Sequence, residues 1–253
     1  MDSDLSPKKR IVIVEDDDHV ARLLEDSLRH NGFTVPAVFR SGEDVLRELP
    51  RHNPDLVLMD IVLDGRIDGI ETAEQILDLF QIPVVYLTAY SNAEVIRRVT
   101  QSAPYGCLVK PCQIHEIVRS IEIALARHRM EETLVESEKR YRKIFDNVSD
   151  AIMVNEIVGG TLGSFTAVNE AALHKLEYER DEMLKLSLMD ICDENCADDC
   201  AAMLRRLLEE GTAACEMILV GKGGRRHLVN ANAHQFLLDG KVLTLTICHD
   251  CAL

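Results

Sequence analysis

The sequence is short of basic residues. Its 253 residues include 28 lysines and arginines against 43 aspartates and glutamates, which gives a formal net charge of −15. Both halves of the chain have fewer basic than acidic residues. Residues 1–128 contain 14 basic and 21 acidic side chains, and residues 129–253 contain 14 basic and 22 acidic side chains. Neither half can neutralise nucleic-acid phosphates over a broad face, and anionic membrane surfaces are disfavoured for the same reason. Direct binding of DNA or RNA is therefore not expected.

Long apolar runs are also missing. No segment approaches the roughly 18 apolar residues that a membrane span needs, and the polar N-terminus lacks the pattern of a secretory signal. We therefore expect a cytoplasmic protein whose eight cysteines are reduced thiols. The balance of 47% hydrophobic and 28% charged residues excludes wholesale disorder, and the length allows two domains.

Apolar runs and helical segments alternate through the first 110 residues. The runs, which predict buried strands, cover residues 11–14, 33–38, 56–59, 84–87 and 107–109. Five strands that alternate with helices predict an α/β domain in which helices cover both faces of a doubly wound parallel sheet. The crossovers between its strands should be right-handed.

Charged and polar residues follow these runs where ligand chemistry collects in such a sheet, at the carboxyl ends of the strands. Glu15 and Asp16 follow the first run, Asp60 the third, Thr88 the fourth and Lys110 the fifth. Each alone is an ordinary strand-end residue. Together they indicate carboxylates that hold a hard divalent cation such as Mg²⁺. A cation also allows a carboxylate to accept a phosphoryl group without prohibitive charge repulsion.

Five stretches over about residues 8–127 carry a resemblance to a known family: KKRIVIVEDDD, DLVLMDIVL, DGIE, VVYLTAY and GCLVKP. In this order and spacing the region resembles the receiver domain of two-component response regulators. The resemblance implies a flavodoxin-like parallel sheet with strand order 2-1-3-4-5. It also implies a partner histidine kinase as the phosphoryl donor and Mg²⁺ as the cofactor.

The resemblance assigns the metal and phosphoryl sites residue by residue. Asp60 matches the phosphoacceptor, which also contacts the metal. Asp16 matches the direct acidic metal ligand, and Glu15 matches its water-mediated companion. The backbone carbonyl of Val62 matches the third protein ligand, whereas Asp17 resembles a spare surface acid.

Two further matches and one departure concern the switch of this family. Thr88 matches the switch hydroxyl, and Lys110 matches the phosphate-pairing lysine, which usually precedes a cis peptide bond at the equivalent of Pro111. Cys107 stands where an aromatic switch residue is usual, and Tyr105 comes two residues too early to replace it. A thiol can fill the pocket of an aromatic side chain, but it has no ring that could rotate inward. The sequence therefore does not predict how phosphorylation would change the outer face of the domain.

One continuous helix is predicted over residues 113–146, which contain neither glycine nor proline. Its second part is charged all round, with the sparse apolar positions Leu134, Val135, Tyr141, Ile144 and Phe145. Such a helix bridges two domains or pairs with a copy of itself, although its heptad pattern is imperfect near residues 128 and 131. We expect a homodimer.

The C-terminal half has a different character. Its motifs are SEKRYRKIFDNVSDAI, FTAVNEAALHKLEYERDEML, LVGKGGRRHLVNANAHQF and LTICHD. In this order they resemble a PAS domain, which implies an α+β fold with a five-stranded antiparallel sheet, often around a small-molecule pocket. Asn169 is expected to cap the helix that follows it. We therefore predict a receiver domain at 1–127, a helical linker at 128–138 and a PAS domain at 139–253.

The cysteines and histidines of this half suggest an alternative role for it, the binding of a metal ion, an iron–sulfur cluster or haem. Zn²⁺ or an iron–sulfur cluster could be bound by a group of residues that comprises Cys192, Cys196, Cys200, Cys215, Cys248, His249 and Cys251. The first three share a face if their segment is helical. Haem would need an axial ligand, and the candidates are His174, His227 and His234. The chain has a single CxxC unit rather than the paired units typical of zinc sites, so buried thiols are the simpler interpretation.

The leading interpretation is a response regulator that accepts a phosphoryl group on Asp60 and relays its state through the long helix to a PAS interaction or sensor domain. We find no phosphoacceptor-histidine helix pair and no ATP lid, so no enzyme activity is expected beyond the receiver's own phosphoryl transfer and dephosphorylation. The first alternative is a small-molecule, redox or metal sensor with the PAS domain as its input. The second is a transcription regulator that binds DNA directly, against which the negative charge argues.

Overall fold

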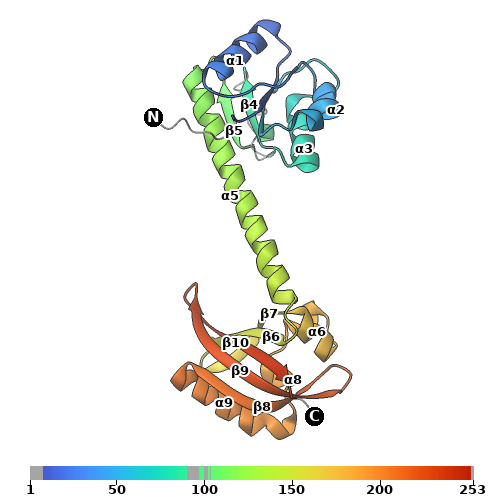
Figure 1. The fold of residues 1–253 in the computed structure, drawn as a ribbon, viewed down its shortest axis with the longest axis vertical. Coiled ribbons are helices and arrows are strands. Elements are labelled where there is room, and N and C mark those ends of the chain that lie inside the picture. The colour runs from blue at the N-terminus through green and yellow to red at the C-terminus, as the bar shows by residue number, and fades with distance from the viewer. Residues whose placement is uncertain (1–7, 90–96, 100–101, 103, 252–253) are drawn as a thin grey trace. The chain divides into compact units, whose positions relative to one another are not determined.

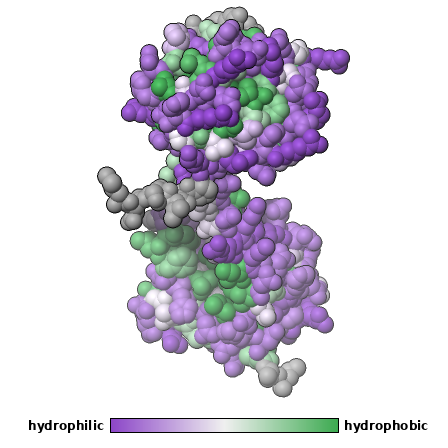
Figure 2. Space-filling view, turned by 45° about the horizontal axis from the view of Figure 1, so that its top comes forward, coloured by the Kyte–Doolittle hydropathy of each residue, from purple (hydrophilic) through white to green (hydrophobic). Residues whose placement is uncertain are grey.

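The computed structural model describes residues 8–89, 97–99, 102 and 104–251. Their contacts divide them into two compact units, one up to Val135 and the other from Glu136 (Figure 1). The predicted boundaries at residues 127/128 and 138/139 stay predictions. The visible surface of each unit is mainly hydrophilic, with hydrophobic residues gathered in patches (Figure 2). None of the helices in the described part of the chain is long and apolar enough to cross a membrane.

The first unit is the predicted parallel sheet, and its strand order β2-β1-β3-β4-β5 confirms the order implied by the resemblance. The strands are β1 (Ile11–Val14), β2 (Val38–Phe39), β3 (Leu56–Asp60), β4 (Val84–Thr88) and β5 (Gly106–Val109). The helices labelled in Figure 1 are α1 (Asp18–His30), α2 (Gly42–His52), α3 (Gly69–Phe80) and α5 (Ile114–Asp146).

Both faces of this sheet are covered. One hydrophobic cluster joins the sheet to α1 and to the first turns of α5, through Leu24, Leu28, Ile117 and Ile121. A second cluster joins the opposite face to α2 and α3. Because the three central strands β1, β3 and β4 are buried on both faces, they read as continuous apolar runs rather than alternating ones.

The second strand differs from its prediction. The apolar run predicted a strand over residues 33–38, but β2 spans only Val38–Phe39, with an isolated bridge between Arg10 and Thr34. Pro36 lies between the two pieces. Proline has no backbone N–H to donate, and so it interrupts the ladder.

The second unit is the antiparallel sheet predicted for a PAS domain, with strand order β7-β6-β10-β9-β8. The strands are β6 (Ala151–Val158), β7 (Thr161–Val168), β8 (Thr212–Val220), β9 (Arg226–Leu238) and β10 (Lys241–Asp250). The helices are α6 (Glu170–Leu176), α7 (Arg180–Met183), α8 (Leu188–Ile191) and α9 (Ala197–Glu210), with a 3₁₀ turn at Glu194–Cys196. The helices pack with one face of the sheet around a single core.

Asn169 caps α6, as predicted, and also holds the end of α5. Its Oδ1 accepts hydrogen bonds from the backbone N–H groups of Ile152 and Ala172, at 2.9 and 3.0 Å. Its Nδ2 donates to the carbonyl oxygens of Phe145 and Asp150, at 3.2 and 2.9 Å. The side chain is fully buried. One residue therefore joins the last turn of α5 to the first strand of the PAS fold.

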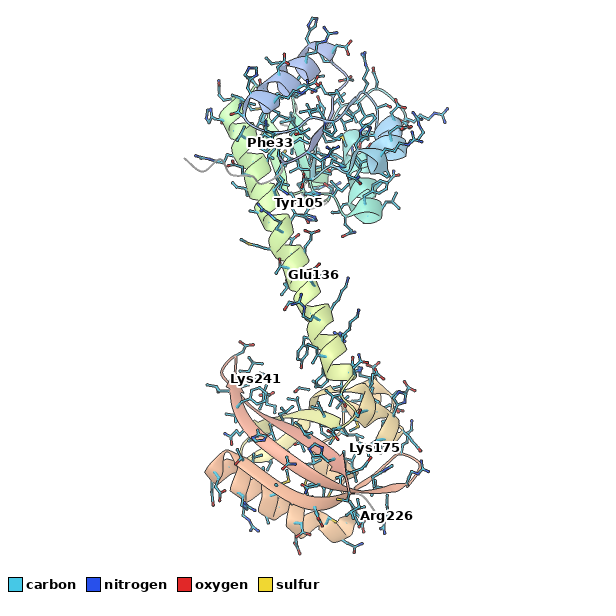
Figure 3. The ribbon with its side chains drawn as sticks, viewed as in Figure 1. Phe33, Tyr105, Glu136, Lys175, Arg226 and Lys241 are labelled. Atoms are coloured by element: carbon cyan, nitrogen blue, oxygen red, sulfur yellow. The ribbon has the colours of Figure 1, made fainter. Side chains whose placement is uncertain are left out.

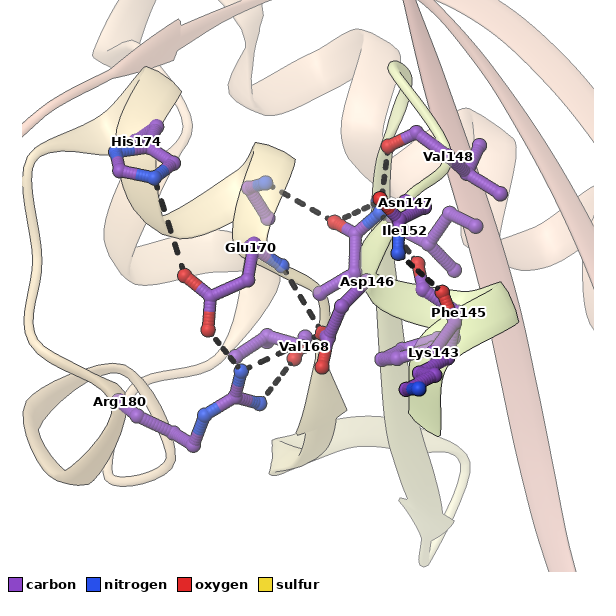
Figure 4. A network of polar contacts seen from close by, with 12 residues as sticks. Lys143, Phe145, Asp146, Asn147, Val148, Ile152, Val168, Glu170, His174 and Arg180 are labelled. Carbon is purple, nitrogen blue, oxygen red and sulfur yellow. Dashed lines mark hydrogen bonds and ion pairs between the residues drawn. The ribbon is translucent and has the colours of Figure 1, made fainter. Parts of the chain in front are cut away.

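Arg180 reinforces the same corner from the protein surface. Its guanidinium donates to Glu170 Oε1 at 2.8 Å and to the carbonyl oxygen of Val168, and it lies 3.5 Å from Asp146 Oδ1 (Figure 4). Asp146 is the last residue of α5. The ion pairs and the Asn169 hydrogen bonds thus converge on the point where the long helix enters the PAS sheet.

Candidate functional site

The parallel sheet brings the predicted site residues to one edge. Glu15 and Asp16 directly follow β1, Asp60 ends β3, Thr88 ends β4, and Lys110 directly follows β5. Neighbouring strands end in step, since Asp60 pairs with Leu87 and Thr88 with Val109. The carboxyl ends of four strands therefore present their side chains at the same level.

Three carboxylates form the centre of this site. Oxygen atoms of Glu15, Asp16 and Asp60 all lie within 4.8 Å of one another. Glu15 is 2% exposed and Asp60 7% exposed, so water screens their charges poorly. Among the described residues this is the one group of His, Cys, Asp and Glu side chains with the geometry to hold a metal ion. An all-oxygen set of carboxylates suits a hard divalent cation.

Lys110 joins two of the three carboxylates. Its Nζ lies 2.6 Å from Glu15 Oε2 and 2.5 Å from Asp60 Oδ2. Burial and the neighbouring charge of Asp60 raise the pKa of Glu15, although the hydrogen bond from Lys110 opposes them. Burial also acts to lower the pKa of Lys110, but its hydrogen bonds to Asp60 and Glu15 outweigh burial and raise that pKa. The lysine is therefore held as a cation within the acidic cluster.

The loop after β3 fixes the remaining oxygen of Asp60. The backbone N–H of Val62 donates to Asp60 Oδ1 at 3.1 Å. The Val62 side chain is 48% exposed beside the site. Whether the Val62 carbonyl ligates a metal is a prediction that the contacts do not test. Thr88 is buried at the end of β4, 3% exposed.

Gly69 is a supporting residue that the motif analysis missed. It is the first residue of α3, and its backbone N–H donates to the carbonyl of Ile61 at 2.9 Å. A Cβ at this position would overlap the backbone carbonyl oxygen of Asp60. Only glycine lets the helix start this close to the strand end. The DGIE stretch, which contains Gly69, is the signal in the sequence for this steric requirement.

The structure corrects the interpretation of Asp17 as a spare acid. Its Oδ1 accepts hydrogen bonds from the backbone N–H groups of His19 and Val20, at 2.8 and 3.2 Å, and so it caps α1. These bonds lower the pKa of Asp17. Side-chain caps of this kind satisfy backbone N–H groups that have no partner within the helix. Asp16 therefore belongs to the carboxylate cluster, whereas the adjacent Asp17 caps α1.

Cys107 and Tyr105 take different places around β5. Cys107 is exposed on the strand. The hydroxyl of Tyr105, labelled in Figure 3, donates to Glu131 Oε2 at 2.6 Å and lies 3.2 Å from His128 Nδ1. The guanidinium carbon of Arg127 sits 5.2 Å from the centre of the tyrosine ring. Tyr105 is thus fixed against α5 rather than against the acidic cluster.

Within the part of the chain that the structure describes, the cysteines of the PAS unit do not form a group with the geometry to hold a metal ion. Cys192 is the C-cap of α8, Cys196 is the N-cap of α9, and Cys200 lies within α9. The condition for a shared helical face, a single helix over all three residues, is therefore not met, because a 3₁₀ turn lies between the two helices. Cys248 is fully buried in the core, and His249 Nδ1 lies 2.9 Å from Asp150 Oδ2.

The three histidines considered for haem are separated. The His174 side chain is 86% exposed on α6, where it lies 3.9 Å from Glu170. His227 and His234 both belong to β9. An odd spacing of seven residues places them on opposite faces of the strand. These positions do not converge on a common site.

Comparisons with known proteins agree with the two units. The family model of the response regulator receiver domain matches residues 11–122, and that of the PAS domain matches residues 149–251. The transcriptional regulatory protein PdtaR of Mycobacterium tuberculosis is 33% identical over 137 residues, which are 54% of this chain and 66% of that protein. The transcriptional regulatory protein AfsQ1 of Streptomyces coelicolor is 35% identical over 123 residues, 49% of this chain and 54% of that protein. The chain thus spans less than two thirds of the length of either.

Solved structures match each unit separately. The signal receiver domain of a modulated diguanylate cyclase from Desulfovibrio desulfuricans G20 is 34% identical, with a TM-score of 0.48, over 49% of this chain and 99% of that one. The PAS domain of an HTR-like protein from Haloarcula marismortui is 24% identical, with a TM-score of 0.43, over 49% of this chain and 98% of that one. The family models thus show that the chain contains a response regulator receiver domain at residues 11–122 and a PAS domain at residues 149–251.

Proposed function

We propose that this chain is a cytoplasmic regulator of a two-component phosphorelay, in which Asp60 accepts a phosphoryl group from a histidine kinase. The observation that supports the proposal is the convergence of Glu15, Asp16 and Asp60 at the end of the sheet, where Lys110 pairs with two of the three carboxylates. Mg²⁺ fits this oxygen set, with Glu15, Asp16, Asp60 and the Val62 carbonyl as its protein ligands. When bound, it supplies charge neutralisation for the phosphoryl oxygens.

The transfer step requires little of the protein except position and charge. An oxygen of the Asp60 carboxylate attacks the phosphorus of a phosphohistidine, the new P–O bond forms as the P–N bond breaks, and the imidazole leaves. Lys110 already contacts Asp60 and is placed to neutralise charge that arrives with the phosphoryl oxygens. The Thr88 hydroxyl, which closes the neighbouring strand, is the donor that we assign to the same oxygens.

A homodimer through α5 is part of this proposal. Four large apolar side chains on the helix are strongly exposed in the single chain: Met130 at 73%, Leu134 at 70%, Tyr141 at 59% and Ile144 at 65%. Their spacings of four, seven and three residues are those of the a and d positions of a heptad, with Ser137 at the intervening d position. A second copy of the helix would cover this stripe. The helix would then carry the receiver's state to the PAS domain of each subunit.

A second candidate function, ligand sensing by the PAS domain, rests on three buried polar atoms. Asn155 Oδ1, Thr244 Oγ1 and Thr246 Oγ1 have no hydrogen-bond partner within the described part of the chain, and their residues are at most 1% exposed. Asn155 and Thr244 are directly opposed on β6 and β10. Buried polar groups normally find a partner, which a small uncharged polar ligand would supply. A small molecule released on denaturation and detected by mass spectrometry would support sensing.

Direct control of transcription is not part of the proposal. The names of PdtaR and AfsQ1 describe those proteins, and each covers only about half of this chain. The net charge of −15 works against a phosphate-binding face. A mobility shift on DNA that weakens steeply with salt would contradict this part of the account.

The phosphorylation proposal is tested with a small phosphodonor, which needs no knowledge of the kinase. The full chain is incubated with acetyl phosphate and Mg²⁺, and its intact mass is measured. Wild type should gain one phosphoryl group, and Asp60→Asn should gain none. Asp64→Asn, which removes an exposed carboxylate four residues later, is the matched control and should be labelled as wild type. Labelling of Asp60→Asn to the wild-type level would refute the assignment.

A further inference from the structure

The loop between β3 and α3, residues 61–68, carries Val62, whose backbone carbonyl we assign to the metal site. Both ends of this loop are fixed. At its start, the backbone N–H of Val62 donates to Asp60 Oδ1 at 3.1 Å. At its end, Asp68 caps α3 by accepting hydrogen bonds from two backbone N–H groups, at 3.0 and 2.9 Å. The middle of the loop needs a support of its own if Val62 is to be held in one position.

Glu43, in the first turn of α2, supplies that support. The backbone N–H of Arg66 donates to Glu43 Oε1 at 2.8 Å, although the two residues are 23 positions apart in the sequence. The hydrogen bond from Arg66 is the main cause that lowers the pKa of Glu43, so the side chain is held as a carboxylate. The other oxygen, Oε2, is buried and has no hydrogen-bond partner in the part of the chain that the structure describes.

The backbone of the loop is shaped around this carboxylate. Gly65 has a φ of +132°, in the region that favours glycine, and a Cβ at this position would lie 2.5 Å from Glu43 Oε2. A side chain at residue 65 would therefore collide with the carboxylate that holds Arg66. The loop and the side chain that supports it are thus closely fitted to each other.

The start of α2, from which Glu43 extends, is itself packed tightly against the start of α3. A Cβ at Gly42, the first residue of α2, would overlap Thr72 Oγ1 on α3. Thr72 is fully buried, and its Oγ1 donates to the carbonyl of Asp68 at 2.7 Å. The two helix starts are therefore in direct contact, and Glu43 reaches the loop from a fixed point.

We propose that Glu43 is a positioning residue of the metal site: it holds the loop after β3 in the conformation from which the Val62 carbonyl binds the cation. This role rests on the proposed function, in which that carbonyl is a ligand of Mg²⁺. Ordering a loose loop costs conformational entropy, so a loop that is ordered beforehand binds its ligand more tightly. Loss of the Glu43 contact should therefore weaken Mg²⁺ binding without removing a ligand.

Calorimetric titration of the full chain with MgCl₂ tests this role. Glu43→Ala should bind Mg²⁺ about tenfold more weakly than wild type, which corresponds to ordering roughly one backbone residue. Glu43→Gln keeps an oxygen that accepts from Arg66 and should stay within about threefold of wild type. Glu48→Ala removes a carboxylate of the same helix that pairs with Arg47 and Arg51, and this matched control should bind as wild type. An equal loss in Glu43→Gln and Glu43→Ala, or no loss in Glu43→Ala, would overturn the proposal.

Hydrogen exchange at the Arg66 amide gives a second readout that needs no metal. In wild type with EDTA this amide should be protected, Glu43→Ala should abolish the protection, and Glu43→Gln should keep it. Exchange of this amide in folded wild type at the rate of an unstructured peptide would overturn the proposal, whether or not a variant folds. A wild type that binds no Mg²⁺ would refute the metal site itself, whereas wild-type binding with an unchanged Glu43→Ala would refute only the role of Glu43.

Discussion

The ammonium nitrogen of Lys110 lies 2.5 Å from Asp60 Oδ2 and 2.6 Å from Glu15 Oε2. It follows β5 and reaches past β4 to a carboxylate at the end of β3. The lysine is thus the internal counter-ion of the acidic cluster. It follows Glu15 by 95 residues in the sequence, and the strand order of the sheet brings the two side chains together. A cation or a phosphoryl group at this site must share the carboxylates with Lys110.

Replacement of Lys110 by alanine should destabilise the receiver most when no divalent cation is present. Glu15 and Asp60 would then be left as buried like charges, at a cost of about 1–3 kcal/mol, less than for a fully buried pair since the lysine is partly exposed. Added Mg²⁺ should restore much of the loss. Lys9→Ala, which breaks the more exposed ion pair with Asp55, is the control and should cost under about 1 kcal/mol. Urea unfolding followed by circular dichroism, with EDTA or with Mg²⁺, would check this, and equal losses in both buffers would contradict it.

Adjacent aspartates allow the metal site to be tested with a close control. Asp16→Asn should weaken Mg²⁺ binding by about tenfold or more, the equivalent of 1.4 kcal/mol, because a charged ligand is lost. Asp17→Asn removes the same charge one residue later but keeps the helix cap, since asparagine caps as well as aspartate. Calorimetric titration with MgCl₂ gives both affinities. If the two variants bind Mg²⁺ equally, the roles that we assign to these aspartates are wrong.

The dimer interface can be probed with neighbouring residues of α5. Leu134→Asp places a charge in the proposed stripe and should convert the dimer to a monomer. Val135→Asp places the same charge on the next residue, which is also exposed, at 48%, but lies off the stripe. That variant should remain dimeric. Light scattering at micromolar concentration distinguishes the two, and a wild-type monomer with and without phosphodonor would rule out the interface.

Asn169 should be the most sensitive polar residue of the PAS unit. Asn169→Ala leaves the N–H of Ile152 and the carbonyls at the end of α5 without their partner, and we expect a loss of about 2–4 kcal/mol. Asn230→Ala, at an exposed position of β9, should change stability by less than about 0.5 kcal/mol. Hydrogen exchange at Ile152 and Ala172 localises the effect. Unchanged exchange at both amides in Asn169→Ala would refute the assigned role.

The acidic site could be predicted from the sequence because strand ends are easy to recognise there. Each buried strand reads as an uninterrupted apolar run, and the first polar residue after it marks the carboxyl edge of the sheet. This rule placed Glu15, Asp60 and Lys110 together without any knowledge of their distances. The same rule was weaker for the second strand, where Pro36 interrupts the ladder within an apolar run.

Contacts that depend on tertiary structure could not be predicted in this way. The spacing of Cys192, Cys196 and Cys200 is helical, but the backbone N–H of Asp193 donates to the carbonyl of Ile218 on β8, and Asp193 Oδ1 accepts from the N–H of Asn195. These bonds end α8 and start a new helix. Similarly, nothing local to Tyr105 indicates a hydrogen bond to a residue 26 positions later.

The most direct test of the account is the position of the phosphoryl group itself. The full chain is phosphorylated with acetyl phosphate and Mg²⁺, and the acyl phosphate is reduced with borohydride, which converts a phosphorylated aspartate to homoserine. Peptide sequencing by mass spectrometry then reads the modified position. The account predicts homoserine at residue 60 in wild type and at no position in Asp60→Asn. Homoserine at residue 16 or 64 with Asp60 unchanged would contradict it.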